Sequence, residues 1–194
     1  MNGDNFETMI EPMTSRAPYM GCEGNHEGSN GFAQYSNRFA VFAMDNSSSP
    51  LPSTPGLSPT PWNAHFFSYN VGLVHIVAMS TEAYFSYPGA VAAQYAFMDA
   101  DLAAVDRTVT PWVIVFGHRS IYCSCDSDCD SAATTVREGA MGMENLLNKH
   151  KVDLWINGHE HNVSPRARSV RDPTLLTLPS LPSTGVVRAQ LRSL

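Results

Sequence analysis

The pattern of apolar positions predicts a βαβ arrangement in the second half of the chain. An apolar run over Trp112–Phe116 is typical of a strand that is buried on both faces, and a second such run covers residues 152–156. Residues 90–105 and 134–150 instead carry apolar side chains at helical spacing. The order helix, strand, helix, strand predicts parallel strands joined by right-handed crossovers.

The first half is less regular. Apolar positions at helical spacing predict a helix over residues 6–16, short or kinked because a proline interrupts it. Residues 17–22 are expected to form a short buried strand. Two β-rich runs, 65–69 and 73–79, flank a short Asn/Gly turn and predict a hairpin. His75 lies inside the second run, where we expect a core or cross-strand histidine rather than a ligand.

Composition and charge divide the chain into one domain and a tail. The 194 residues suffice for one domain with a core, which we place at residues 1–162. Residues 45–61 are rich in Ser and Pro and predict an irregular surface loop. Residues 163–194 form a divergent basic tail: from residue 162 onward the net charge is +4, against −10 for the preceding part. This reversal fits a change of reading frame, a splicing artefact or an incomplete gene model, and a disordered basic tail is the alternative.

The net charge of −6 argues against a general nucleic-acid or anionic-membrane binder. No apolar run approaches the roughly 20 residues of a membrane span. The first residues have neither the basic segment nor the apolar segment of a signal peptide.

The cysteines leave the redox compartment open. Cys22 stands alone, whereas Cys123, Cys125 and Cys129 share one short segment. A zinc site is conceivable there, but the paired C-x2-C spacing is missing. Local disulfide pairing in an oxidising compartment, or free thiols, is favoured instead.

Three apolar, strand-like runs end in a glycine that is followed by polar residues of the kind that bind metals. In an open α/β sheet the carboxyl ends of parallel strands share one edge, so these residues can converge. Imidazole binds zinc, iron and manganese, and an amide oxygen suits a hard ion. The pattern therefore predicts a metal site. The three segments are Gly24-Asn25-His26-Glu27, Gly117-His118 and Gly158-His159-Glu160-His161.

Two residues in or beside these segments are not counted among the candidate ligands. Glu160 stands between two candidate ligands, so its side chain is expected to point away as a surface or outer neighbour. Arg119 follows His118 directly and could bind phosphate or form a structural ion pair, and the sequence favours neither.

Taken together, these segments resemble the calcineurin-like metallophosphoesterases. The surrounding residues narrow the resemblance to the purple acid phosphatases, over roughly residues 6–162. These residues are Pro18-Tyr19-Met20, Ser80-Thr81-Glu82, Trp112 and His118-Arg119-Ser120-Ile121-Tyr122. The resemblance implies an α/β (α+β) fold, a β-sandwich flanked by helices, with a dinuclear metal centre of iron and a divalent Fe, Zn or Mn ion.

The resemblance also assigns roles to five residues. Asn25, His118 and His159 look like ligands of the divalent ion, and His161 looks like a ligand of the ferric ion. His26 looks like the catalytic residue that binds the phosphoryl group or protonates the leaving alcohol.

The chain departs from the family pattern at its start. The family has two earlier motifs, a strand-end Asp and a Gly-Asp-x-x-Tyr, that supply the ferric carboxylate, the bridging Asp and the tyrosinate. We expect the domain to be incomplete at its N-terminus, because Gly3-Asp4-Asn5-Phe6-Glu7 has Glu7 where Tyr is needed. The carried-over ligands are neutral, so at most one weakly bound divalent ion is expected.

The expected function is hydrolysis of phosphate monoesters by a metal-dependent acid phosphatase, impaired in this chain. One alternative is a phosphodiesterase or nuclease of the same superfamily, and another is an inactive fragment or binding module. The expected partner is a phosphate monoester, with no nucleic acid and no membrane span, and the oligomeric state is open. The family implies a secreted or a vacuolar or lysosomal glycoprotein. Sequons occur at Asn46 and Asn162, but the second abuts His161 and is not expected to be used.

Overall fold

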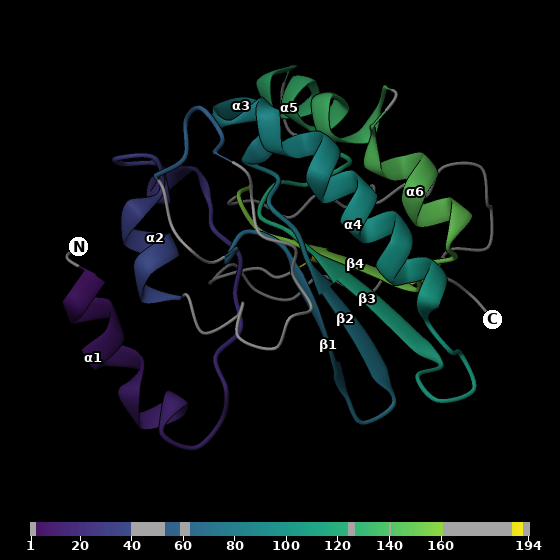
Figure 1. Cartoon of the computed structure of the whole chain (residues 1–194), viewed down its shortest axis with the longest axis horizontal. Coiled ribbons are helices and arrows are strands. Elements are labelled where there is room, and N and C mark those ends of the chain that lie inside the picture. Colours follow the sequence, from purple (N-terminus) through teal and green to yellow (C-terminus); the bar gives the residue numbers. More distant parts are fainter. Residues whose placement is uncertain are drawn as a thin grey trace.

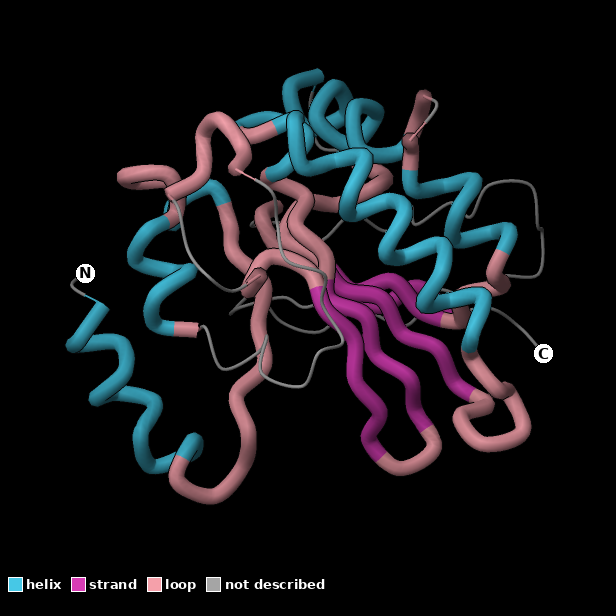
Figure 2. The backbone as a smooth tube through the Cα atoms, viewed as in Figure 1, coloured by secondary structure: helices cyan, strands magenta, loops and turns pink. Residues whose placement is uncertain are grey.

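A five-stranded mixed sheet forms the centre of the fold (Figures 1 and 2). The computed structural model describes residues 3–39, 53–58, 63–123, 127–139, 141–160 and 188–191. The strands follow one another across the sheet in chain order. They are β1 (Phe67–Val71), β2 (Val74–Ala78), β3 (Trp112–Phe116), β4 (Leu154–Asn157) and β5 (Arg188–Leu191).

The pairing of the strands confirms the predicted α/β class. β1 and β2 form the antiparallel hairpin, while β2, β3 and β4 run parallel to one another. The turn of the hairpin uses Gly72, whose φ of +57° favours glycine. Because β2, β3 and β4 are parallel, their carboxyl ends lie at one edge of the sheet, as the sequence predicted.

Helices cover one face of this sheet. α4 and α6 run across it in Figure 1, with α5 beside them. The main core lies here and is built from Val77, Val115 and Trp155 of the strands and Met98 and Leu146 of the helices, among others. The helical elements are α1 (Gly3–Thr14), η1 (Asn25–Glu27), α2 (Ala33–Arg38), α3 (Ala83–Ser86), η3 (Pro88–Ala90), α4 (Val91–Ala104), α5 (Ser127–Arg137) and α6 (Met143–Lys149).

The helix predicted over residues 134–150 is divided into two, α5 and α6. Gly139 adopts a φ of +97°, which side chains other than glycine rarely adopt. Gly142 lies so close to the preceding turn that an added Cβ would be 2.3 Å from the carbonyl oxygen of Arg137. These two backbone positions end one helix and begin the next, and the apolar spacing alone did not reveal the break.

The strand predicted over residues 17–22 was wrong, because this segment has no regular secondary structure. A strand needs a neighbouring strand to bond its backbone groups, and within the described ranges none pairs with it. The helix at the N-terminus was predicted correctly: α1 contains Pro12 and has no buried residue.

Two further predictions can be compared with the sheet. His75 is 8% exposed and bonds Asn70 Oδ1 at 2.7 Å and Asp101 Oδ2 at 2.8 Å, which confirms a cross-strand core histidine. In β3, Val113 and Val115 are buried, but Trp112 at the strand's start is 41% exposed, so burial on both faces does not extend over the whole strand.

Most of the predicted Pro/Ser loop and of the tail lies outside the described residues, as do Asn46, His161 and Asn162. The domain boundary at residue 162 therefore stays a prediction. Within the tail, β5 pairs with β4 in antiparallel register, with Ala189 opposite Ile156. None of the described helices has the length and apolar character needed to cross a membrane.

Candidate metal centre

Two neighbouring parallel strands place His118 and His159 side by side. His118 follows the end of β3 by two residues, and His159 follows the end of β4 by two. The backbone continues to bond beyond the strands: Gly117 N donates to Ile156 O at 3.0 Å, and Gly158 N donates to His118 O at 2.9 Å. As a result, His159 Nδ1 lies 2.8 Å from His118 Nε2.

Asn25 approaches the two histidines from a separate segment. It begins η1, directly after Gly24, and its Oδ1 lies 2.9 Å from His118 Nε2. The turn is held by the carboxylate of Glu27, which accepts a hydrogen bond from Gly24 N at 2.8 Å. Gly24 is packed under the His118 ring, and a Cβ added there would lie 2.8 Å from two ring atoms.

The donor atoms fit a divalent ion. Asn25 Oδ1 is an acceptor, and each neutral imidazole has one nitrogen with a free lone pair. A single cation can use all three lone pairs at once, and two imidazoles with an amide oxygen suit zinc, iron or manganese. Within the described ranges no three His, Cys, Asp or Glu side chains gather as a metal site, because this cluster has two histidines and an asparagine.

The other predicted site residues do not belong to this cluster of three side chains. His26 lies in η1 with an exposed side chain, near enough for its charge to act on His118. His161, predicted for the second ion, lies outside the described residues. Glu160 is an outer neighbour of the cluster, as expected: its Oε1 lies 3.9 Å from His159 Nε2, whereas the other ring nitrogen, Nδ1, faces His118.

Arg119 forms the structural ion pair that was one of its two predicted roles. Its guanidinium bonds both carboxylate oxygens of Glu82, at 2.7 and 2.9 Å, and lies 4.3 Å from the centre of the Phe85 ring. Its Nη1 also lies 3.2 Å from His159 Nε2. Arg119 is therefore fixed at the side of the metal ligands.

The environment keeps His118 neutral. Burial, followed by the charges of His159, Arg119 and His26, lowers the pKa of His118 to about 4, although the negative charge of Glu23 acts in the opposite direction. A metal ligand must be deprotonated. His118 is therefore ready to bind a cation at weakly acidic pH.

This pKa predicts how stability depends on pH in the metal-free protein. The folded-state pKa lies below the usual 6.5, so the unfolded chain binds more protons between pH 6.5 and about 4. The stability that depends on a neutral His118 ring is fully present above pH 6.5 and is lost as the pH falls toward 4. We expect the unfolding free energy of His118→Gln, measured in urea with EDTA, to fall less steeply with decreasing pH than that of the parent. The two slopes should differ by the equivalent of up to about one bound proton per molecule. Equal slopes for the two proteins would contradict the lowered pKa.

Sequence reasoning missed two buried carboxylates near the centre, Glu82 and Glu23, which are 0% exposed. Glu82 bonds Arg119, and Glu23 belongs to a network described below. One signal was available for Glu23: a charged residue stands directly before Gly24, at the end of a run that was predicted to be buried.

The disulfide alternative, which together with free thiols the sequence favoured over a zinc site, holds for one of the clustered cysteines. Cys123 is disulfide-bonded, whereas Cys22 is free. The side chains of Cys125 and Cys129 lie outside the described residues.

Comparisons with known proteins agree with this geometry. The family model for calcineurin-like phosphoesterases matches residues 2–163. The chain is 36% identical over 171 residues to human acid phosphatase type 7, and 33% identical over 175 residues to the Arabidopsis thaliana protein named "probable inactive purple acid phosphatase 9". A solved structure of a purple acid phosphatase from yellow lupin seeds superimposes with a TM-score of 0.52 at 25% identity.

The chain matches only part of each of these proteins. The alignments cover 82% of this chain and 35% of the human protein, and 81% of this chain and 26% of the Arabidopsis protein. For the lupin structure the shares are 82% and 27%. The chain thus spans about a third or less of the length of these relatives.

Proposed function

Since the chain belongs to the calcineurin-like phosphoesterase family, we propose that it hydrolyses phosphate monoesters as an acid phosphatase of the purple type, with low activity. The proposed centre is dinuclear, of iron and a divalent Fe, Zn or Mn ion. Asn25, His118 and His159 would hold the divalent ion, and His161 would bind the iron.

The observation that carries this proposal is that Asn25 Oδ1 and His159 Nδ1, from two separate segments, both lie within 2.9 Å of His118 Nε2 on a third. Three neutral ligands bind a divalent ion more weakly than a set that includes carboxylates, because no ligand charge offsets that of the cation. Low affinity, and with it low activity, follows from this donor set.

The residues around the centre support monoester hydrolysis. A bound cation would neutralise phosphate charge and lower the pKa of a water molecule. His26 is exposed beside the ligands, where its protonated ring can donate to the leaving oxygen. Arg119 is paired to Glu82, so its guanidinium acts as a structural partner rather than as a group that binds the phosphoryl group.

The decisive experiment compares metal binding and turnover in matched variants. We expect the chain to bind Zn²⁺ or Mn²⁺ and, after loading with iron and either ion, to hydrolyse p-nitrophenyl phosphate at pH 5. Asn25→Ala is expected to weaken Zn²⁺ binding by more than about 100-fold, since loss of even an outer partner of a ligand costs 10–100-fold. Asn37→Ala, an equally exposed asparagine in α2, is the matched control and should bind as the parent does.

Three outcomes would contradict the proposal in different ways. Equal metal affinity of Asn25→Ala and the parent would remove the assigned site. Faster hydrolysis of bis(p-nitrophenyl) phosphate than of the monoester would favour a phosphodiesterase. Metal binding without turnover of either ester would favour an inactive or binding protein, like the relative whose name calls it probably inactive.

We also propose that the chain acts in an oxidising compartment, as a secreted or as a vacuolar or lysosomal glycoprotein. The disulfide at Cys123 supports this, because such bonds persist mainly in oxidising environments. Asn46 is the proposed glycan site. Treatment of the protein from its natural source with a deglycosylating enzyme should lower its apparent mass, and an unchanged mass would contradict the glycan.

A further inference from the structure

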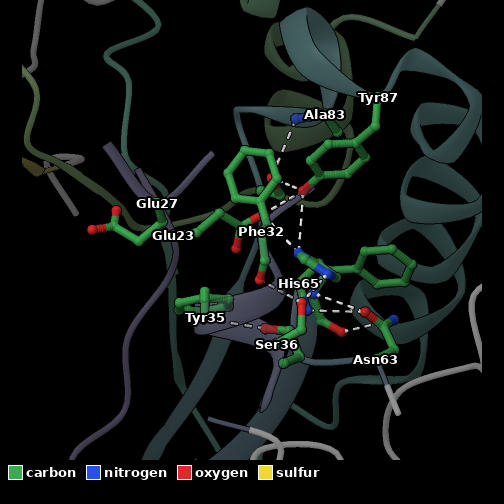
Figure 3. A network of polar contacts seen from close by, with 12 residues as sticks. Glu23, Glu27, Phe32, Tyr35, Ser36, Asn63, His65, Ala83 and Tyr87 are labelled. Carbon is green, nitrogen blue, oxygen red and sulfur yellow. Dashed lines mark hydrogen bonds and ion pairs between the residues drawn. The ribbon is translucent and has the colours of Figure 1, made fainter. Parts of the chain in front are cut away.

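A buried carboxylate, Glu23, lies in a network of polar contacts just before Asn25 in the chain (Figure 3). The side chain is 0% exposed. Its Oε1 lies 3.0 Å from His65 Nδ1 and accepts a hydrogen bond from the hydroxyl of Tyr87, which also contacts the hydroxyl of Ser80. The other ring nitrogen of His65 lies 3.1 Å from Ser36 Oγ.

Glu23 remains charged in this network. Its Oε1 is held by the His65 ring at 3.0 Å and by the hydroxyl of Tyr87, and hydrogen bonds of this kind favour the charged form of a carboxylate. Tyr87 remains a donor, because burial, the charge of Glu23 and the bond to it raise the pKa of the phenol well above its usual value.

Stability alone does not account for a carboxylate at this position. Its second oxygen, Oε2, is buried and has no hydrogen-bond partner among the described residues. An unsatisfied buried polar atom costs about 1–3 kcal/mol, and more when it is charged. A neutral side chain of similar size would avoid the cost of a buried charge. The charge is therefore retained for something other than packing.

The position of Glu23 connects it to the metal ligands. It stands two residues before Asn25, separated by Gly24, the residue that is packed under the His118 ring. The network thus reaches the turn that carries Asn25 and, through Gly24, the ring of His118.

The partners of Glu23 come from segments that are distant in sequence. His65 precedes β1, Ser80 follows β2, Tyr87 lies between α3 and η3, and Ser36 belongs to α2. Among the described residues, no strand pairs with the turn over Asn25–Glu27. The hydrogen bonds of Glu23 tie the chain just before this turn to the edge of the sheet.

We propose that Glu23 is a positioning residue for the metal centre: its buried negative charge fixes the Asn25 turn against His118 and favours a divalent cation at a set of neutral ligands. This inference rests on the proposed metal site. It assigns Glu23 no contact with the ion or the substrate. Tyr87 and His65 act only through Glu23, as the groups that hold the carboxylate.

The experiment uses a second, partly buried histidine–carboxylate pair in the same chain as its control. Glu23→Gln keeps the size of the side chain and removes the charge. Asp101→Asn makes the same kind of change in α4, where Asp101 lies 2.8 Å from Nε2 of His75 in β2. If Glu23 had a merely structural role, both variants would have a lower melting temperature, with no difference between them in Zn²⁺ affinity or amide exchange.

Zn²⁺ affinity and hydrogen exchange distinguish a positioning role of Glu23 from a merely structural one. We expect Glu23→Gln to bind Zn²⁺ about 10-fold more weakly, the lower end of the effect of an outer partner. The backbone amides of residues 24–28 should exchange about 10-fold faster without metal, because the local opening that permits exchange is less costly. Asp101→Asn should change both by less than about two-fold, as expected for a separate network.

Equal Zn²⁺ affinity of Glu23→Gln and Asp101→Asn would overturn the inference, while Zn²⁺ binding by the parent would still support the proposed function. If the parent binds no Zn²⁺, the proposed metal site fails, and exchange at residues 24–28 alone tests the positioning role. Should Glu23→Gln not fold, Tyr87→Phe keeps the charge and removes one donor. It should accelerate exchange at the same amides, and unchanged exchange there would overturn the inference.

Discussion

Gly24→Ala is expected to abolish metal binding almost completely while leaving the fold in place. The backbone of Gly24 is extended, with φ −117° and ψ 179°, so alanine is compatible with its conformation. The new methyl group would, however, lie 2.8–2.9 Å from three atoms of the His118 ring. The ring must move away from Asn25, and a displacement of about 1 Å can cost on the order of 100-fold in a process that depends on geometry.

A second glycine at the same centre provides the control for this variant. A Cβ added at Gly158 would meet atoms of His118 only at 3.9 and 4.0 Å, which is ordinary van der Waals contact. We therefore expect Gly158→Ala to bind Zn²⁺ as the parent does, measured by titration calorimetry. If both variants lose Zn²⁺ binding equally, the close contact between Gly24 and His118 is not the cause.

Glu82→Ala should lower the free energy of unfolding by about 3 kcal/mol, because removal of one partner of a buried ion pair leaves the other charge uncompensated. Glu82 is 1% exposed and Arg119 15% exposed, at the side-chain level, and the two charges bond through two oxygens and two nitrogens. The estimate lies at the lower end of the usual range, because Arg119 retains its contact with Phe85.

The matched control is an ion pair on the surface. Glu138 bonds Arg137 Nη2 at 2.7 Å, but its side chain is 58% exposed, so Glu138→Ala should change stability little. Urea unfolding of both variants measures the difference. A loss in Glu82→Ala no greater than that in Glu138→Ala would show that the Arg119 pair contributes no more than a surface pair.

The parts of the fold that local sequence patterns determine were predicted, and the parts that distant pairs determine were not. β3 was predicted at its observed residues, because a β-branched run carries its own signal. The expectation that Asn25 and His118 meet rested on two apolar runs that end in glycine, although only the run before His118 is a strand. The Glu23–His65 and Glu82–Arg119 pairs join residues 42 and 37 positions apart, and no local periodicity connects them.

The α5–α6 break shows a second limit of the pattern. Apolar spacing continues through residues 134–150, so it predicted one helix. The break depends on Gly139 at positive φ and on the close approach of Gly142 to Arg137 O. A glycine is compatible with both a continuous helix and a turn, and the packing of the surrounding chain decides between them.

The backbone bonds between the ends of β3 and β4 have a kinetic consequence for any ion held there. Gly117 and Gly158 donate across to the neighbouring segment, so the sheet fixes the separation of His118 and His159 before an ion arrives. Asn25 is attached through a short turn, so the sheet does not fix it. Release of the ion should therefore begin with departure of the amide oxygen, and its rate should follow the opening of the Asn25 turn rather than the stability of the sheet.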